Sequence, residues 1–208
     1  MDATPVIDTV VFDVGRVLLQ WDPLFLFRKL LPDDAAIAAF MAETDFMRVH
    51  ATFDGGRPFA EGLAELAARF PHHAPHIMAW DELWEETIPG AIDGTVALLE
   101  QLHARGVPLF ALTNYSAEKF PAARSRFPFF ARFRDIVVSG EEKLIKPDAR
   151  IYRILLQRTG SDPARTLFID DSAANIAAAA AQGMVTHQFT EPSALHRDLQ
   201  AHGLLPRA

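Results

Sequence analysis

Short runs of β-branched and aromatic residues alternate along much of the chain with longer stretches of helical periodicity. The runs predict strands at residues 6–12, 107–112, 136–138 and 166–169, with a further candidate at 185–189. The stretches between and after them predict helices at residues 95–105, 117–126, 148–158 and 173–182. Strands that alternate with helices in this way need crossover connections. The pattern therefore predicts a parallel sheet covered by helices on both faces.

Residues 18–91 follow a different pattern. Alanine, leucine and phenylalanine recur there at helical spacing, and no strand-like run interrupts them. We therefore expect a helical unit inserted after the first strand. The predicted organisation is a Rossmann-like α/β core made of residues 1–17 and 92–208, with residues 18–91 as a helical cap domain.

The composition disfavours several classes of function. The 27 acidic residues outnumber the 20 basic ones, and the resulting charge of −7 repels nucleic-acid phosphates and anionic membrane surfaces. No apolar run approaches the roughly 20 residues that span a bilayer. The chain has no cysteine, which excludes disulfides, thiolate metal ligands and cysteine nucleophiles. We therefore expect a cytoplasmic monomer or homodimer, with neither a nucleic acid nor a membrane as its partner.

Polar side chains follow three of the predicted strands at the point where each strand ends. They are Asp13, the pair Thr113 and Asn114, and the pair Asp170 and Asp171, while Lys146 opens a further predicted helix. Each of them alone is explained as a helix cap or a strand end. In a parallel sheet, however, the carboxyl ends of the strands share one edge, where ligands bind. Carboxylates gathered there repel one another unless a cation or a lysine compensates, so the pattern favours a metal site.

Four segments resemble the ordered motifs of the haloacid dehalogenase-like superfamily. They are residues 10–13 (VVFD), 111–114 (ALTN), 146–152 (KPDARIY) and 168–172 (FIDDS). The resemblance covers nearly the whole chain, and the helical insert resembles the cap that this family carries after its first motif. It implies a hydrolase of a small phosphorylated metabolite with Mg²⁺ as cofactor, and it is closest to a branch that includes sugar-1-phosphate phosphatases.

The resemblance also implies roles for individual residues. Asp13 would attack phosphorus and form an aspartyl-phosphate, which divides one difficult displacement into two easier ones. The ligands of Mg²⁺ would be Asp13, Asp171 and the carbonyl of Gly15, with Asp170 as an auxiliary ligand and Asn175 orienting them. The other catalytic residues would be Lys146, which balances charge on the phosphoryl oxygens, Thr113, whose hydroxyl donates hydrogen bonds to them, and Asn114.

The chain departs from the family pattern at Gly15. Most phosphatases of the superfamily carry a second aspartate two positions after the nucleophile, as general acid and base. A positioned acid is worth roughly 10² to 10⁴ in rate, and its loss matters most where an alkoxide leaving group needs a proton. Gly15 therefore favours esters with a good leaving group, such as a sugar 1-phosphate, an acyl phosphate or an aryl phosphate.

Three residues are candidate substrate contacts. Asp22 could replace the missing acid if the chain folds back over the site, but Asp followed by Pro23 is also a favoured helix start, which is the interpretation we prefer. Arg16 either reaches a substrate anion or turns outward into solvent. Tyr115, which directly follows Asn114, is the third candidate.

Two other functions remain open. A 2-haloacid dehalogenase of this fold would use Asp13 to attack carbon, and it would need no acid at position 15 because halide leaves as a stable anion. Tyr152 also resembles the dehalogenase pattern. Against this reaction, Asp170 and Asp171 would place extra negative charge near a carboxylate substrate. The second alternative is an inactive binding protein that retains the fold.

Three further features of the predicted cap need an interpretation. The histidines at 72, 73 and 76 lie among prolines with no carboxylate at ligand spacing in the sequence, so we expect a solvated surface. The aromatic residues Phe46, Phe53, Trp80 and Trp84 are expected to pack in the cap rather than to stack on substrate. Residues 54–57 (DGGR) form a charged turn that faces either the mouth of the active site or the solvent.

Overall fold

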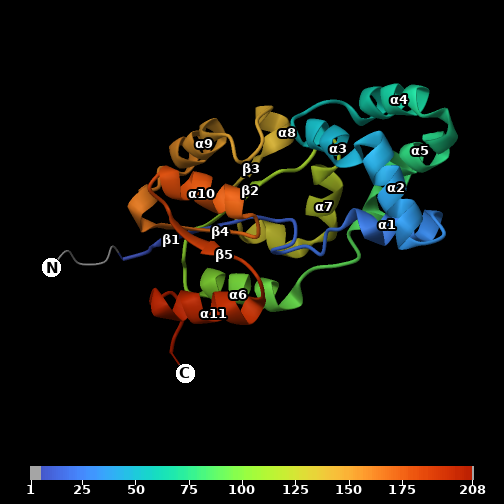
Figure 1. Cartoon of the computed structure of the whole chain (residues 1–208). Coiled ribbons are helices and arrows are strands. Elements are labelled where there is room, and N and C mark those ends of the chain that lie inside the picture. The colour runs from blue at the N-terminus through green and yellow to red at the C-terminus, as the bar shows by residue number, and fades with distance from the viewer. Residues whose placement is uncertain (1–5, 208) are drawn as a thin grey trace.

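The computed structural model describes residues 6–207, in which five strands form one parallel sheet (Figure 1). The strands are β1 (Thr9–Phe12), β2 (Leu109–Thr113), β3 (Asp135–Val138), β4 (Thr166–Asp170) and β5 (Val185–Gln188). Their order across the sheet is β3-β2-β1-β4-β5, and each neighbouring pair is parallel. The predicted α/β class is confirmed, and the candidate strand at residues 185–189 is present as β5.

The central position of β1 follows from its side chains, which are buried on both faces of the sheet. Val10 and Phe12 point into the larger apolar cluster, whereas Val11 points into a second cluster with Phe168 and Tyr152. Phe12 is in register with Ala111 on β2 and with Ile169 on β4. The residue after Phe12 therefore emerges between the ends of the two neighbouring strands.

Helices cover both faces of the sheet, as the alternating pattern predicts (Figure 1). The core helices are α6 (Asp93–Ala104), α7 (Phe120–Arg126), α8 (Ser139–Glu142), α9 (Ala149–Thr159), α10 (Ala173–Ala181) and α11 (Pro192–Ala201). Short 3₁₀ turns lie at Pro128–Arg132 and Pro163–Arg165. α6 and α11 lie against one face, and α9 and α10 against the other. The periodicity did not predict α8, which has only four residues, or α11.

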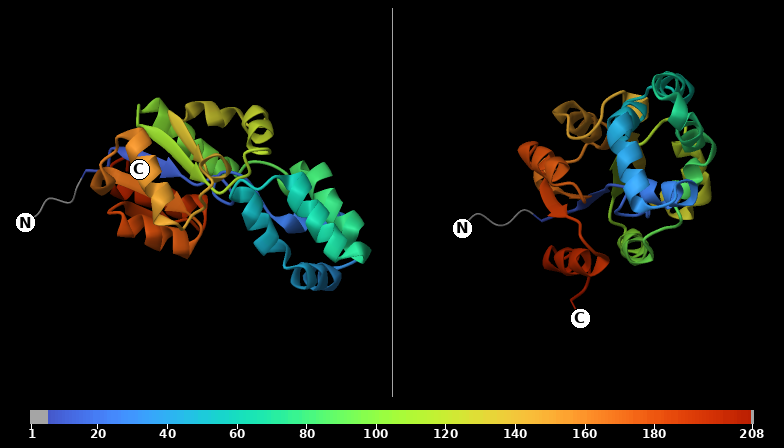
Figure 2. Two further views of the ribbon diagram at one scale, coloured as in Figure 1. Left: turned by 90° about the horizontal axis from the view of Figure 1, so that it is seen from above. Right: turned by 45° about the vertical axis from the view of Figure 1, so that its right-hand side comes forward.

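The segment between β1 and α6 is helical throughout its regular structure, among the described residues. It contains α1 (Pro23–Leu30), α2 (Asp34–Thr44), α3 (Phe46–Asp54), α4 (Phe59–Arg69) and α5 (Ala74–Glu82), with 3₁₀ turns at Pro71–His73 and Trp84–Thr87. Figure 2 shows this unit beside the core. An isolated bridge pairs Leu19 with Ala91, so the two chain crossings between the units run side by side. Division of the chain near residues 18 and 91 remains a prediction.

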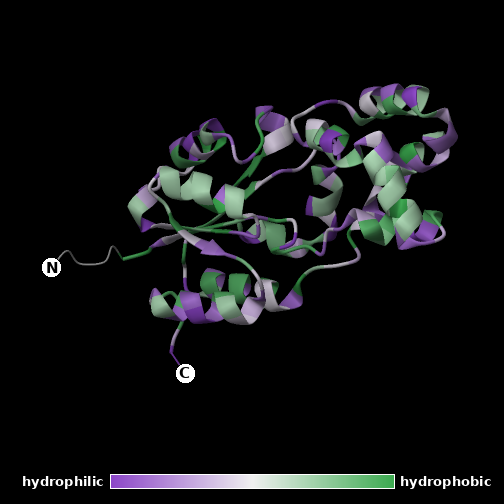
Figure 3. Ribbon diagram, viewed as in Figure 1, coloured by the Kyte–Doolittle hydropathy of each residue, from purple (hydrophilic) through white to green (hydrophobic). Residues whose placement is uncertain are grey.

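Aromatic side chains fill the interior of the cap. Phe27 and Trp80 stack with their ring centroids 5.5 Å apart, and Phe46 meets Trp80 edge to face at 4.9 Å. Such pairs contribute roughly 0.5–1.5 kcal/mol each beyond their buried area. Hydrophobic residues predominate in β1, β2 and β4, whereas β5 is largely hydrophilic (Figure 3). Among residues 6–207, no helix has both the length and the apolar character that crossing a bilayer requires.

Candidate active site

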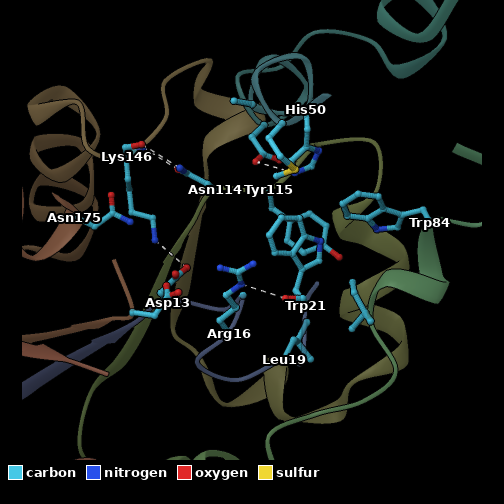
Figure 4. A pocket seen from close by; sticks show the side chains of 16 residues that line it. Asp13, Arg16, Leu19, Trp21, His50, Trp84, Asn114, Tyr115, Lys146 and Asn175 are labelled. Carbon is cyan, nitrogen blue, oxygen red and sulfur yellow. Dashed lines mark hydrogen bonds and ion pairs between the residues drawn. The ribbon is translucent and has the colours of Figure 1, made fainter. Parts of the chain in front are cut away.

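A cavity of about 260 Å³ lies between the carboxyl ends of the strands and the cap (Figure 4). The core contributes Asp13, Asn114, Lys146 and Asp171 among others, and the cap contributes His50, Asp54 and Trp84 among others. The cavity thus has a charged floor and a largely aromatic wall. Such a cavity at the carboxyl edge of a parallel sheet is the expected place for a small ligand.

Asp13 lies at the centre of the charged floor. Its Oδ1 accepts a hydrogen bond of 2.7 Å from the N–H of Val14 and lies 2.8 Å from the Nζ of Lys146. Burial raises the pKa of Asp13 to about 7, and the charge of Lys146 opposes that rise. A cation bound beside the carboxylate would favour its ionised, nucleophilic form further.

Lys146 is fixed in place by three groups of the core. Its ammonium donates to the carboxylate of Asp170 at 2.7 Å and to the carbonyl of Leu112 at 3.0 Å. The side chain of Asn114 accepts from the N–H of Lys146 at 2.8 Å and donates to its carbonyl at 3.0 Å. Burial by itself lowers the pKa of this lysine, but Asp13 and Asp170 outweigh burial and raise it. Lys146 therefore remains protonated next to the nucleophile, and Asn114 acts by positioning it.

Asp170 is fully buried at the end of β4 and is surrounded by donors. Besides Lys146, the amide of Asn175 donates to both carboxylate oxygens at 3.0 and 3.1 Å, and the N–H of Ser172 donates at 2.8 Å. The hydroxyl of Tyr152 in turn donates to the carbonyl of Asn175 at 3.1 Å. Because its oxygens are engaged in this way, Asp170 is better placed to hold the ammonium of Lys146 than to bind a metal ion directly.

The residues predicted to hold a metal ion come together. Asp13, Asp170 and Asp171 each offer a carboxylate oxygen, and these oxygens lie within 4.8 Å of one another. Asp171 is half-buried, and burial followed by the charge of Asp170 raises its pKa. The charges of Arg16 and Lys146 oppose that rise. Gly15 lines the same cavity. This all-oxygen set suits a hard divalent cation such as Mg²⁺.

Thr113 is the last residue of β2, and its hydroxyl is one of the buried polar groups that have no partner in the described part of the chain. The residue does not itself line the cavity, although its neighbour Asn114 does. A buried hydroxyl without a partner costs free energy unless a ligand or water satisfies it. Its assignment as a donor to phosphoryl oxygens stays a prediction.

Two of the three candidate substrate contacts line the cavity. Arg16 has a left-handed backbone (φ 60°), and its guanidinium lies over the ring of Trp21, 5.3 Å from the centroid. Figure 4 shows its side chain turned into the cavity. Tyr115 is buried there, and its hydroxyl has no hydrogen-bond partner among the described residues. Burial raises the pKa of Tyr115 to about 12, so that it remains a neutral donor.

Asp22 is the exception, and its role as a candidate acid is corrected. Its carboxylate accepts from the N–H of Leu24 at 2.9 Å and caps α1, and Asp22 is not among the cavity residues. An extended backbone at Asp22, followed by Pro23 in the first turn, is the geometry of a helix start. The capping interpretation is therefore confirmed.

Local sequence patterns do not identify the cap residues that line the cavity. Asp54 ends α3 and is the one residue of the turn at 54–57 that lines the cavity. Trp84 was expected to serve only for packing, yet it contacts Tyr115 edge to face at 5.9 Å and also lines the cavity. His50 stacks on Trp21 at 5.3 Å. The Asp-Gly-Gly turn was the only local signal among these positions.

The histidines of the cap also need a correction. Glu43 on α2 lies 2.9 Å from the Nε2 of His72 and 3.1 Å from the Nε2 of His73. The chain does therefore bring a carboxylate to ligand distance, from about thirty positions earlier in the sequence. Glu43 and His72 are exposed, which agrees with the predicted solvated surface.

Comparison with known proteins places this chain in a family. Residues 7–183 match the family of haloacid dehalogenase-like hydrolases. A sesquiterpene phosphatase from Aspergillus oryzae is 28% identical over 195 residues, which cover 91% of this chain and 93% of that protein. Mouse acyl-CoA dehydrogenase family member 10 is 34% identical over 213 residues; the match covers 92% of this chain but only 19% of the mouse protein.

Solved structures share the fold at lower identity. One is a haloacid dehalogenase family enzyme from Bacteroides thetaiotaomicron, in complex with magnesium and inorganic phosphate. It superposes with a TM-score of 0.66 at 21% sequence identity, over 88% of this chain and 94% of the other. The shared architecture supports the fold described above.

Proposed function

Because this chain belongs to the haloacid dehalogenase-like hydrolase family, we propose that it is a magnesium-dependent phosphatase that forms an aspartyl-phosphate on Asp13. One observation carries the proposal: the carboxylates of Asp13 and Asp171 lie close together on the cavity floor, beside a fully buried, protonated Lys146. An anionic nucleophile, an oxygen-rich cation site and a fixed positive charge are what phosphoryl transfer requires. The phosphatase among the relatives and the magnesium and phosphate bound by the Bacteroides enzyme support the same reaction.

In the first step, an oxygen of Asp13 attacks phosphorus and the bond to the leaving oxygen breaks. Lys146 holds the attacking carboxylate in place and offsets part of the negative charge. Mg²⁺, which Asp13, Asp171 and the carbonyl of Gly15 would hold, supplies the charge that allows an anionic nucleophile to approach a phosphate dianion. Arg16 would contact the anionic group from the mouth of the cavity. Water then cleaves the aspartyl-phosphate and restores Asp13.

The cavity wall favours an apolar alcohol as the leaving group. Trp21, Met47, Trp84 and Ile88 line it, and hydroxyl-rich sugars would find few partners on these side chains. The sesquiterpene phosphatase, whose name indicates an apolar substrate, supports this class. We therefore propose a phosphate ester of an apolar or aromatic alcohol, in place of the sugar 1-phosphate that Gly15 suggested.

Phosphate and halide release test the proposal together. The wild-type protein is incubated with p-nitrophenyl phosphate, hexyl phosphate and glucose 1-phosphate, each in Mg²⁺ and in excess chelator, and separately with 2-chloropropionate. We expect magnesium-dependent phosphate release, with higher kcat/KM for the apolar esters than for the sugar ester. Halide release without phosphate release would establish the dehalogenase instead, and no turnover in either assay would support a binding protein.

The matched variants are Asp13→Asn and Asp34→Asn. Asp13→Asn keeps the shape of the side chain but removes the attacking charge, so turnover of all esters should be lost. Asp34 lies at the exposed start of α2, paired with Arg28, and its variant should keep full activity. Activity that survives in Asp13→Asn would identify another nucleophile.

A further inference from the structure

Asp54 is a largely buried carboxyl group that the cap extends toward the charged floor. It ends α3, lines the cavity with Asp13 and Lys146, and exposes only 13% of its side chain. Among the described residues its carboxylate accepts no hydrogen bond. The Nε2 of His50 lies 3.4 Å from its Oδ2. An ionised carboxylate buried without donors is costly, and the cost falls when the group holds a proton.

The backbone of Asp54 is docked on the core. The hydroxyl of Ser139 on α8 donates to the carbonyl of Asp54 at 2.6 Å, and the same hydroxyl accepts from the N–H of Tyr115 at 2.9 Å. Two residues on, Gly56 approaches α8 so closely that an added Cβ would lie 2.7 Å from the carbonyl oxygen of Gly140. The position of the carboxyl group over the cavity is therefore fixed from both sides of the cap and core junction.

The proposed reaction needs a proton at the leaving oxygen. An apolar alcohol is a poor leaving group as an alkoxide, and position 15, two residues after the nucleophile, is a glycine with no side chain to supply the proton. The cavity residues that carry ionisable protons are Asp13, Arg16, His50, Asp54, Tyr115, Lys146 and Asp171. Each of them can be compared with what the step requires.

Most of these groups are excluded by their charge state or by another role. Asp13 and Asp171 are engaged as nucleophile and cation ligand, and Arg16 is a guanidinium without an acidic proton. Although burial opposes it, the charges of Asp13 and Asp170 raise the pKa of Lys146, which keeps its proton. Burial lowers the pKa of His50 to about 4, so it has no proton to give at neutral pH.

Tyr115 and Asp54 are the remaining acids. Burial raises the pKa of Tyr115 to about 12, which makes it a weak acid at neutral pH. Burial raises the pKa of Asp54 to about 7, against the lowering effect of Lys146 and with a further contribution from the charge of Asp13. A general acid works best when its pKa lies near the operating pH, and only Asp54 meets that condition.

We propose that Asp54 is the general acid and base of the reaction, supplied by the cap in place of a residue beside the nucleophile. This assignment rests on the proposed phosphatase function. As Asp13 bonds to phosphorus, the bond from phosphorus to the leaving oxygen breaks, and the proton of Asp54 passes to that oxygen to give the neutral alcohol. The Asp54 carboxylate then takes a proton from the water that attacks the aspartyl-phosphate, which releases inorganic phosphate and returns both side chains to their starting states.

Leaving-group dependence tests the assignment. We compare kcat/KM for hexyl phosphate and p-nitrophenyl phosphate in the wild-type protein, in Asp54→Asn and in the cap control Asp34→Asn. The parameter kcat/KM includes only steps up to departure of the alcohol, so a slow second step does not disturb it. Asp54→Asn should lose about 10² to 10⁴ in kcat/KM on hexyl phosphate. On p-nitrophenyl phosphate, whose leaving group needs no proton, it should lose less than about tenfold.

A pH profile of the wild-type protein gives a second measurement that does not depend on the folding of a variant. On hexyl phosphate, kcat/KM should fall as the pH rises above about 7, because Asp54 loses its proton, whereas on p-nitrophenyl phosphate this decline should be absent. The groups that face Asp54 are His50, Lys146, Asp13 and Tyr115. Ionisation of these groups would affect kcat/KM for both esters. A decline that appears only with hexyl phosphate therefore reports the loss of the Asp54 proton.

The outcomes separate the two proposals. Equal losses on both esters in Asp54→Asn, or identical pH profiles for the two esters, would overturn the role of Asp54 while the phosphatase stands. A wild-type protein that releases phosphate from neither ester in Mg²⁺ would overturn the proposed function itself.

Discussion

The ammonium of Lys146 lies 2.7 Å from the carboxylate of Asp170, and the two side chains expose only 1% and 0% of their surfaces. The pair extends to Asp13 at 2.8 Å, which makes a buried triad of two negative groups and one positive group. The ammonium stabilises both carboxylates because it lies close to each of them. Removal of this cation leaves two buried carboxyl groups without compensation.

Lys146→Met should therefore lower the free energy of unfolding by roughly 3–5 kcal/mol. Urea denaturation at pH 7 in chelator measures it. The control is Arg150→Met, which removes the exposed pair of Arg150 with Asp148 and should cost less than about 1 kcal/mol. Similar costs for the two variants would mean that the triad is not stabilised as the geometry indicates.

Magnesium should raise the thermal unfolding temperature of the wild-type protein by several degrees. A ligand at 100 times its Kd stabilises the folded state by about 2.7 kcal/mol. Asp171→Asn should abolish most of that rise, because it removes a carboxylate ligand without filling the site. Glu43→Gln, in the other cluster of potential ligands, should keep the rise intact. An unchanged rise in Asp171→Asn would place the cation elsewhere.

Asp54→Asn should change how stability depends on pH. The pKa of Asp54 is raised from 3.8 to about 7 in the folded protein, so the folded state binds this proton more tightly than the unfolded state. The stability contributed by the protonated group is present in full below pH 4 and is lost as the pH rises through 7. Relative to the variant, the wild-type protein should thus lose roughly 2–4 kcal/mol between pH 4 and 8 in chelator. His50 titrates in both proteins and largely cancels from the difference.

Asp54→Asn should also release nitrophenol in a burst. With p-nitrophenyl phosphate the first step needs no acid, but water attack on the aspartyl-phosphate still lacks its base. Stopped-flow absorbance should show about one nitrophenol per active site followed by a slow phase, whereas Asp34→Asn should behave like the wild-type protein. Release that is linear from the start would show that the second step does not depend on Asp54.

Gly56→Ala tests whether docking of the cap sets the position of Asp54. Gly56 has φ +92°, and a Cβ there would lie 2.7 Å from backbone of α8, so the cap must shift away from the core. We expect kcat/KM to fall more on hexyl phosphate than on p-nitrophenyl phosphate, because only the first ester needs a proton from Asp54. Gly90→Ala, where an added Cβ meets nothing within 4 Å, is the control and should be close to neutral. Full activity in Gly56→Ala would show that the junction tolerates displacement.

Local sequence determined the core of this protein. A strand buried on both faces leaves a continuous apolar run, and a helix leaves a repeat of 3.6 positions, so both are visible without coordinates. The parallel order then brings the strand ends together, which is why Asp13, Lys146 and Asp171 could be assigned to one edge before any distance was known. The helical nature of residues 23–82 was visible for the same reason.

The tertiary structure decided what closes over that edge. Asp54 and Trp84 reach the cavity because α8 and the cap dock through contacts between residues more than eighty positions apart, and no local period records such contacts. The same limit explains Glu43, which meets two histidines across the cap. Asp22, by contrast, caps its own helix, as the local Asp-Pro pattern predicts. Side chains at the ends of strands are placed by topology, whereas those of an inserted unit are placed by packing, and packing depends on the whole surface at once.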